Sequence, residues 1–375
     1  MGLVALGCSD SPTAPTPVVA LAWSVALPGP SFVTRTLLTA NNAVYVQLAR
    51  SVLALRADSG RQLWTSDTTA APNDYGQGLL ATPTQLLVRY TSNVQALGVT
   101  TGAVTWTYSA GNGVAAVAAD GANAYIASGN RLAAVALASG TTVWNLDSTS
   151  VCDSNPCIVT GVVASGDTVL FLSGAAAFGV PPVVRAVRAS TGAMLWTVAA
   201  VPTISATPSL TAYDAKVQVS GSMLVLSDLL SGFVMGIDRM TPRVVWSRIH
   251  GSSDVTGSFP VVTRGDTVFA SGRGGGTEAI RASTGALLWQ QVGVSSATAF
   301  TPCGGQLLLR TLPVASVQLW VLSAGDGRIR GGFNIFDLWP ITDPVAVGSR
   351  AFVGTYTLSH RIAVNALVAL DCTKL

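Results

Sequence analysis

Hydrophobic residues along this chain fall into short runs in which apolar positions alternate with polar or small ones. Residues 42–48, 166–172 and 265–270 are examples, and they combine β-branched or aromatic side chains with a period of two. Such a period places alternate side chains on opposite faces of a strand, and turn-forming residues separate the runs. The pattern predicts an all-β protein made of many short strands. No apolar run reaches the length of about 18 residues that a transmembrane helix needs.

A longer repeat is superimposed on this alternation. Six tryptophans recur at intervals of roughly 40 to 50 residues, and each has a turn-forming residue four positions earlier. The tryptophans are Trp64, Trp106, Trp144, Trp196, Trp246 and Trp289, and the turn residues are Gly60, Gly102, Gly140, Gly192, Pro242 and Gly285. A small residue followed by an aliphatic one precedes each turn. A seventh copy keeps its turn at Gly327 but has Gly331 in place of the tryptophan.

The repeat has a direct structural meaning. The small–aliphatic pair ends a tightly packed strand, and glycine makes the tight turn because it tolerates positive φ. The next strand carries the tryptophan, whose large surface is buried between neighbouring sheets. With two further strand-like runs before each pair, the unit has four strands in about 40 residues, which is the size of a propeller blade.

The two ends of the chain complete each other. Residues 18–25 form a strand with Trp23 but have no partner strands before them, whereas the last repeat ends at Asp371 without its tryptophan strand. Pairing the two closes the ring and removes exposed sheet edges. We therefore expect an eight-bladed β-propeller of four-stranded antiparallel blades over residues 18–375. The wider tryptophan spacing places extra loop in blades four and five.

The pattern Ala-Leu-x-x-x-[Ser/Thr]-Gly-x-x-x-Trp resembles the repeat of the pyrroloquinoline-quinone-type (PQQ-like) propellers, and it covers nearly the whole chain. That family includes quinone-dependent alcohol dehydrogenases and also non-catalytic bacterial lipoproteins. One of the latter is the propeller subunit of the outer-membrane β-barrel assembly machinery. The resemblance implies the fold strongly and the function weakly, since propellers serve many purposes.

Composition and charge exclude some classes of protein. About half of the residues (49%) are hydrophobic and only 10% are charged, so the bulk of the chain is not disordered. The net charge of +3 is small, and the basic residues are scattered without a basic stripe. Nucleic acid is therefore not an expected partner.

Residues 1–17 resemble the signal and tether of a bacterial lipoprotein. A short apolar stretch ends in Gly7-Cys8, and a segment rich in Ser, Pro and Thr follows. The resemblance implies that Cys8 is lipidated and that the protein lies on the periplasmic side of the bacterial envelope. Cys8 would be its sole attachment to the membrane. The match departs from the pattern at Ala5, where Leu is usual, and the segment is too short for a complete signal. The alternative is a disordered tail with an isolated cysteine.

The remaining four cysteines fit an oxidising compartment. Cys152 and Cys157 bracket a turn-rich tip, so we expect them to form one disulfide. Cys303 ends the first strand of blade seven and Cys372 follows the third strand of blade eight. Both positions lie on the same face of the disc, and this predicts a second disulfide. With no CxxC motif and only two histidines, we expect no metal site.

The sequence offers no constellation typical of catalysis. Quinone dehydrogenases of the resembled family hold their cofactor with adjacent cysteines, a catalytic Asp and Ca²⁺, and this chain has no adjacent cysteines. Most of the carboxylates stand in turns, at Asp58, Asp120, Asp167, Asp266 and Asp326. Asp238 and Asp371 directly follow the aliphatic residue of the repeat, a position that Arg56, Arg188 and Arg281 hold in other blades. Such residues usually cap the backbone. His250 and His360 are interpreted as surface or capping residues, and residues 272–276 as a hairpin tip. We expect no catalytic residue and no cofactor.

One segment has the composition of a contact surface. Residues 333–341 hold three aromatics, and Phe336 and Trp339 are candidates for binding a partner. Alternatively, Phe333 or Phe336 replaces the missing tryptophan between blades seven and eight. The apolar loops at 174–182, with Phe178, and at 201–204 could extend such a surface.

These features favour a non-enzymatic scaffold that binds other envelope or membrane proteins. The alternative is a quinone-dependent oxidoreductase or sugar-processing enzyme that uses the central mouth of the propeller. An adhesion or ligand-sensing module is a third interpretation, and the sequence does not distinguish it from a scaffold.

Overall fold

The structure is a computed structural model. It describes sixteen segments, and the statements below concern these residues. They are 21–27, 36–48, 51–67, 78–111, 113–152, 157–175, 181–203, 215–228, 233–250, 260–272, 276–294, 297–311, 319–333, 339–340, 342–359 and 362–375.

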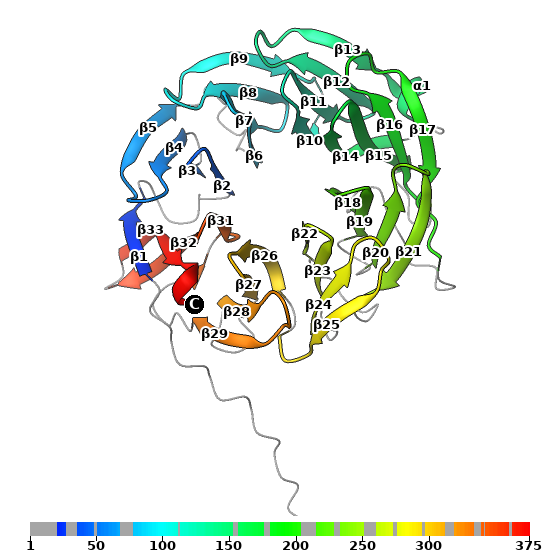
Figure 1. Ribbon diagram of the computed structural model, residues 1–375. Coiled ribbons are helices and arrows are strands. Elements are labelled where there is room, and N and C mark those ends of the chain that lie inside the picture. Colours follow the sequence, from blue (N-terminus) through cyan, green and yellow to red (C-terminus); the bar gives the residue numbers. More distant parts are fainter. Residues whose placement is uncertain are drawn as a thin grey trace, which may run out of the picture.

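Eight antiparallel sheets form the ring seen in Figure 1, as the repeat predicts. Each of the first seven sheets is a blade of four strands that follow one another in the chain. Blades one to four contain β2 (Thr36–Ala40), β3 (Ala43–Gln47), β4 (Ser51–Arg56), β5 (Gln62–Asp67); β6 (Gly78–Ala81), β7 (Gln85–Arg89), β8 (Asn93–Gly98), β9 (Val104–Ser109); β10 (Val114–Ala119), β11 (Asn123–Ser128), β12 (Arg131–Ala136), β13 (Thr142–Leu146); and β14 (Cys157–Ser165), β15 (Thr168–Ala175), β16 (Val183–Arg188), β17 (Met194–Ala199).

The same order continues around the second half of the ring. Blades five to seven contain β18 (Ala215–Ser220), β19 (Met223–Asp228), β20 (Phe233–Asp238), β21 (Arg243–Ile249); β22 (Val261–Arg264), β23 (Thr267–Gly272), β24 (Gly276–Arg281), β25 (Leu287–Gln291); and β26 (Ala297–Cys303), β27 (Gln306–Thr311), β28 (Leu319–Ser323), β29 (Ile329–Phe333). Residues 267–272 and 276–281 are paired strands, so residues 272–276 connect a hairpin as expected.

Blade eight joins the two ends of the chain. Its third strand β33 (Ile362–Asp371) pairs with β32 (Arg350–Ser359) on one side and with β1 (Leu21–Ala26) on the other. This confirms the predicted closure, although β1 extends to Ala26 and residues 18–20 lie outside the described residues. The innermost position is divided between β30 (Trp339–Pro340) and β31 (Val345–Val347), which both pair with β32. The described part of blade eight therefore begins at Trp339.

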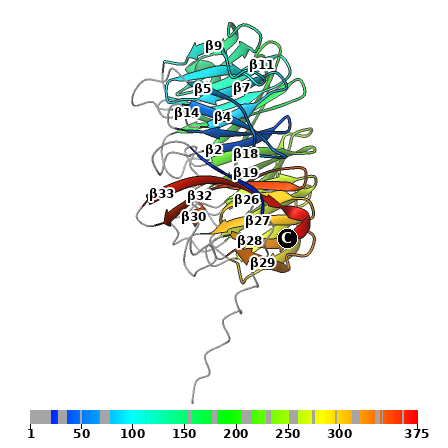
Figure 2. The ribbon, with the colours of Figure 1, turned by 90° about the vertical axis from the view of Figure 1, so that its left-hand side faces the viewer.

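The strand order divides the disc into two faces. Connections between first and second strands, and between third and fourth strands, are mostly tight turns, and we call their side the turn face. Connections between second and third strands, and between blades, reach the other side, which we call the loop face. Several of these are long, such as that from β17 to β18. Viewed on edge, the disc shows the β32–β33 hairpin extending toward the loop face (Figure 2).

The core lies between neighbouring blades. Second and third strands are buried on both sides, as shown by β3, in which all five residues are buried. Side chains alternate between the two interfaces, so that Tyr45 of β3 packs against Leu86 and Val88 of blade two, whereas Val44 and Val46 pack against blade eight. Each interface is thus a separate apolar layer, and the stability of the ring depends on all eight.

The extra length before and within blade four takes a defined form. The short helix α1 (Ser148–Val151) precedes the blade, and the side chain of Asp147 accepts hydrogen bonds from the backbone N–H groups of Thr149 and Ser150 at its start. The strands β14 and β15 have nine and eight residues, and they are the longest strands of blades one to seven. Within the described part of the chain, no helix is long and apolar enough to cross a membrane.

Candidate functional site

The repeat tryptophans link each blade to the next one. The indole nitrogen of a tryptophan in the fourth strand donates a hydrogen bond to a carbonyl oxygen that directly follows the third strand of the next blade. The pairs are Trp23 with Ala57 (3.2 Å), Trp64 with Val99 (2.8 Å), Trp106 with Leu137 (2.6 Å), Trp144 with Ala189 (2.8 Å), Trp246 with Ala282 (2.7 Å) and Trp289 with Ala324 (3.0 Å). We call this arrangement the indole contact.

The repeat glycine completes the indole contact. Gly102 has a φ of +69°, and a Cβ atom added there would lie 2.5 Å from Cε3 of Trp64 in the preceding blade. The same approach recurs between Gly140 and Trp106. Glycine is needed both for the left-handed backbone of the turn and for the space that the indole occupies. The repeat therefore encodes the interface between blades.

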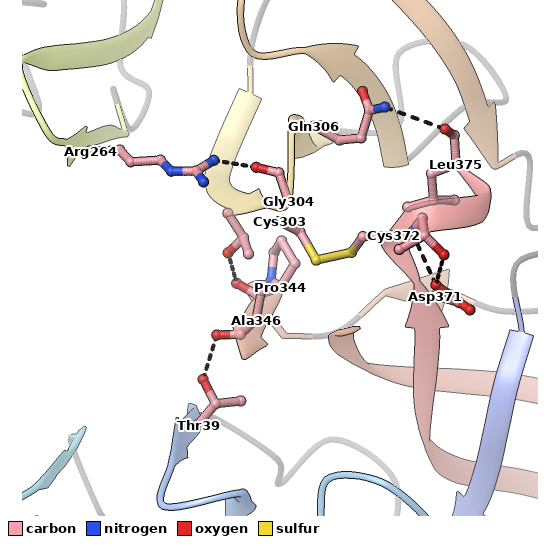
Figure 3. The surroundings of a disulfide bond; sticks show 12 residues. Thr39, Arg264, Cys303, Gly304, Gln306, Pro344, Ala346, Asp371, Cys372 and Leu375 are labelled. Carbon is pink, nitrogen blue, oxygen red and sulfur yellow. Dashed lines mark hydrogen bonds between the residues drawn. A yellow bond between two sulfur atoms is a disulfide. The ribbon is translucent and has the colours of Figure 1, made fainter. Parts of the chain in front are cut away.

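The interface between blades seven and eight is built differently. Gly331 pairs with Val321 at the position that holds the tryptophan in other blades. Across the same interface, the structure joins Cys303 at the end of β26 to Cys372 after β33, with a Cα–Cα distance of 6.0 Å. Figure 3 shows this disulfide between the two blades, with the carboxyl-terminal residue Leu375 close by. It is the pair that strand topology predicts.

A second disulfide joins Cys152 to Cys157, also with a Cα–Cα distance of 6.0 Å. Cys152 directly follows α1 and Cys157 begins β14, so the bond lies on the loop face of blade four. Residues 153–156 lie outside the described residues. The bond therefore closes a short loop beside the long β14–β15 hairpin.

The sequence interpretation of His250 as a surface or capping residue is wrong. His250 is only 3% exposed, and its Nδ1 lies 3.1 Å from Oε2 of Glu278 in the neighbouring blade. Its Nε2 lies 3.2 Å from the carbonyl oxygen of Gly276, so both ring nitrogens face oxygen acceptors. Arg248 lies 3.6 Å from the same carboxylate. These groups form a buried ionic cluster between blades five and six, and His360 lies outside the described residues.

The pKa of Glu278 reflects these neighbours. Burial favours its neutral form, but the hydrogen bond and charge of His250 and the charge of Arg248 hold the pKa below its usual range. Glu278 is therefore an ionised member of the cluster. No local pattern marks Glu278 as a partner of His250, because the two residues belong to different repeats.

Five of the carboxylates at turns and strand ends accept hydrogen bonds from backbone N–H groups, as the sequence predicts: those of Asp120, Asp238, Asp266, Asp326 and Asp371. Asp238 accepts from the backbone N–H of Met240 at 2.9 Å, and Asp371 accepts from that of Thr373 at 3.0 Å. Hydrogen bonds from the hydroxyls of Thr241 and Thr373 are the main cause of the lowered pKa values of these two carboxylates. These contacts give the two aspartates a structural role.

The candidate partner-binding residues are Phe178, Phe336 and Trp339. Phe178 falls between β15 and β16 and Phe336 between β29 and β30, and both lie outside the described residues. Trp339 is not in a loop, because it begins β30 and pairs with Tyr356 of β32. Val201, which follows β17, is 54% exposed on the loop face. Cys8 lies outside the described residues.

Among the described residues, no group of three or more His, Cys, Asp or Glu side chains is arranged to hold a metal ion. The loop face, the seam between blades seven and eight, and the ionic cluster between blades five and six are therefore the features on which a function can be argued.

Comparison with known proteins places the chain in a family. The family model described as "Outer membrane protein assembly factor BamB" matches residues 20–109, 42–251 and 90–333. The chain belongs to this BamB-like family. The match covers most of the propeller, in agreement with the repeat. No curated protein is similar enough in sequence to count as a match.

Solved structures show the same fold at low sequence identity. The crystal structure of BamB from Moraxella catarrhalis is 18% identical, with a TM-score of 0.64, over 92% of this chain and 96% of that one. The computationally designed Ika8 protein is 14% identical, with a TM-score of 0.67, over 92% and 98%. A europium-containing methanol dehydrogenase is 11% identical, with a TM-score of 0.65, over 93% of both chains. At these identities the likeness concerns the fold alone.

Proposed function

We propose that this protein is a non-enzymatic scaffold that binds other proteins on the periplasmic side of the bacterial envelope. Membership of the BamB-like family is the observation that carries the proposal, because the matched residues span nearly the whole ring. The model's description names an outer-membrane assembly factor, and a role in assembling envelope proteins follows from it by analogy.

We assign partner binding to the loop face. Its connections are longer and more varied than the tight turns of the opposite face, and binding residues concentrate on such loops when a rigid scaffold holds them. Val201 is an exposed apolar residue of this face, and in the sequence the candidates Phe178 and Phe336 fall between β15 and β16 and between β29 and β30. Aromatic side chains supply much of the binding energy at protein interfaces.

Site-specific crosslinking in cells tests this assignment. A photo-reactive amino acid at position 201 samples the loop face, and one at Met240, which is 77% exposed beside the tight turn of blade five, samples the turn face. We expect discrete crosslinked proteins from position 201 and few from position 240. Equal crosslinking from both faces would contradict the assignment, and Phe178→Ala or Phe336→Ala should weaken the crosslinks from position 201.

A lipid anchor at Cys8 is the second part of the proposal. The Gly7-Cys8 pair followed by a Ser/Pro/Thr-rich tether supports it. Metabolic labelling with a fatty-acid analogue should mark the wild-type protein and not the Cys8→Ala variant, which should also leave the membrane fraction. Labelling that survives in Cys8→Ala would place the lipid elsewhere.

A quinone-dependent oxidoreductase remains the second candidate, because a methanol dehydrogenase shares the fold. The residues of this chain do not fit the cofactor site of that class. Its cysteines pair at sequence separations of 5 and 69 instead of side by side, and the described residues contain no cluster of ligands for Ca²⁺. Reconstitution with pyrroloquinoline quinone and Ca²⁺ distinguishes the two functions. Stoichiometric binding with dye reduction would favour the enzyme, whereas we expect neither.

A further inference from the structure

The seam between blades seven and eight lacks both halves of the indole contact. At six other interfaces, the tryptophan of one blade lies over a glycine that is four residues beyond the third strand of the next, whereas Pro242 holds this position between blades four and five. At this seam, Gly331 stands at the tryptophan position and has no side chain, and Leu375 lies at the glycine position, four residues beyond β33. The third strand β33 leads into the short 3₁₀ helix η1 (Cys372–Lys374) instead of a hairpin, since β1 supplies the fourth strand.

Cys372 occupies the repeat position that accepts the indole hydrogen bond elsewhere. Ala57 directly follows the third strand of blade one, and its backbone N–H donates to Asn42 at 3.0 Å while its carbonyl accepts from Trp23. Cys372 directly follows β33, and its N–H donates in the same way to Ser349 at 2.8 Å. The position that receives a tryptophan in six other interfaces therefore holds, at this seam, a cysteine bonded to the preceding blade.

The disulfide lies within the apolar layer of the seam. Cys303 is 1% exposed and Cys372 is 4% exposed, and they belong to one cluster with Leu308, Val353 and Leu370 from both blades. A hydrogen bond also crosses the seam, in which Nε2 of Gln306 donates to the carbonyl oxygen of Leu375 at 3.4 Å (Figure 3). The covalent bond thus joins the two blades where six of the other interfaces have an indole contact.

We propose that the Cys303–Cys372 disulfide replaces the indole contact at this seam and makes closure of the ring dependent on the redox state. Reduction by a dithiol transfers two electrons and two protons to the bond, gives two cysteine thiols and leaves the reductant as a cyclic disulfide. The two thiols no longer join the blades. With neither an indole nor a covalent bond, the seam opens more often than the other interfaces, and η1, β33 and β1 are the elements released first.

The proposal is independent of the function proposed above. It concerns the ring itself, and it implies a protein whose closed form is maintained in an oxidising compartment. The Cys152–Cys157 bond provides an internal comparison, because it closes a short loop at the start of blade four, away from the seam between blades seven and eight.

Hydrogen exchange measured by mass spectrometry tests the proposal. The oxidised full chain is compared with the same protein after reduction and alkylation, and with the variants Cys303→Ser/Cys372→Ser and Cys152→Ser/Cys157→Ser. We expect exchange in β1, β33 and β26 to rise by about tenfold or more on loss of the Cys303–Cys372 bond, while blades two to five stay unchanged. The Cys152→Ser/Cys157→Ser variant should show no rise at the seam until it is reduced.

Several outcomes would overturn the proposal. Free thiols at positions 303 and 372 in the isolated protein would remove its basis. Verified reduction without faster exchange at the seam, or with equally faster exchange in all blades, would also contradict it. If the Cys303→Ser/Cys372→Ser variant does not fold, reduction of the already folded wild type gives the same comparison.

Discussion

The indole nitrogen of Trp106 in blade two donates a hydrogen bond of 2.6 Å to the carbonyl oxygen of Leu137 in blade three. Trp106 is buried, so the bond is shielded from water and leaves a buried acceptor if it is lost. The same relation recurs around the ring, which explains why tryptophan and not another large apolar residue marks the repeat.

Trp106→Phe tests this relation. Phenylalanine fills part of the space but donates no hydrogen bond, so we expect a loss of about 2–3 kcal/mol in the free energy of unfolding. Trp320→Phe is a suitable control, because Trp320 is only partly buried and lies outside the repeat position. Urea denaturation of both variants measures the effect. Equal losses would mean that volume alone, and not the hydrogen bond, determines the stability.

Gly102→Ala tests the other half of the contact. Alanine must adopt a φ of +69° and place its Cβ 2.5 Å from the indole of Trp64, so we expect a loss of about 2–4 kcal/mol. Gly221→Ala is the matched control. Gly221 also has a positive φ, +58°, but an added Cβ would meet no described atom within 4 Å, and we expect a loss of about 1 kcal/mol. Thermal unfolding compares the two, and similar losses would show that backbone conformation alone requires the glycine.

Removal of the closing strand tests the ring. Deleting residues 1–26 removes β1, exposes the edge of β33 and eliminates the hydrogen bond from Trp23 to Ala57. Trp23 is only partly buried, and we expect a loss of several kcal/mol, because an unpaired edge adds to the loss of packing. Deleting residues 1–20 keeps β1 and should leave the melting temperature unchanged. The same melting temperature for both deletions would exclude the closure as a source of stability.

The repeat predicted most of the fold because its residues act locally. A glycine at positive φ, a small–aliphatic pair and a tryptophan identify each hairpin, and one hairpin per repeat determines the number of blades. Strand order alone also places Cys303 and Cys372 on the same face of the disc, which predicted the second disulfide. The structure adds that this disulfide occupies the position of the missing indole contact.

The ionic cluster was not predictable for a related reason. His250 and Glu278 meet only across the boundary between blades, and neither stands in a motif that relates it to the other. Trp339 shows a second limit. The aromatic composition of residues 333–341 indicated a contact surface, and it gave no sign that pairing with Tyr356 places Trp339 in the innermost strand position of blade eight. Contacts between repeats depend on register, which a one-dimensional pattern does not contain.

Glu278→Gln tests the buried cluster through pH. The pKa of Glu278 is held below its usual range, so its ionised form stabilises the fold at pH values above that range, and this contribution is lost as pH falls through the lowered value. At pH 7 we expect the variant to be less stable by about 1–3 kcal/mol, because glutamine keeps a hydrogen-bond acceptor but not the charge that faces His250 and Arg248. Below about pH 4 the carboxyl group of the unfolded chain is largely protonated, so the advantage of the wild type shrinks and is lost as the pH falls through the lowered pKa of the folded state. Asp167→Asn is the control, as this exposed carboxylate lies 4.0 Å from Arg188 and should contribute little at either pH. Urea denaturation at pH 7 and near pH 3.5 measures the difference, and a loss that stays constant between the two would show that charge is not the stabilising property of Glu278.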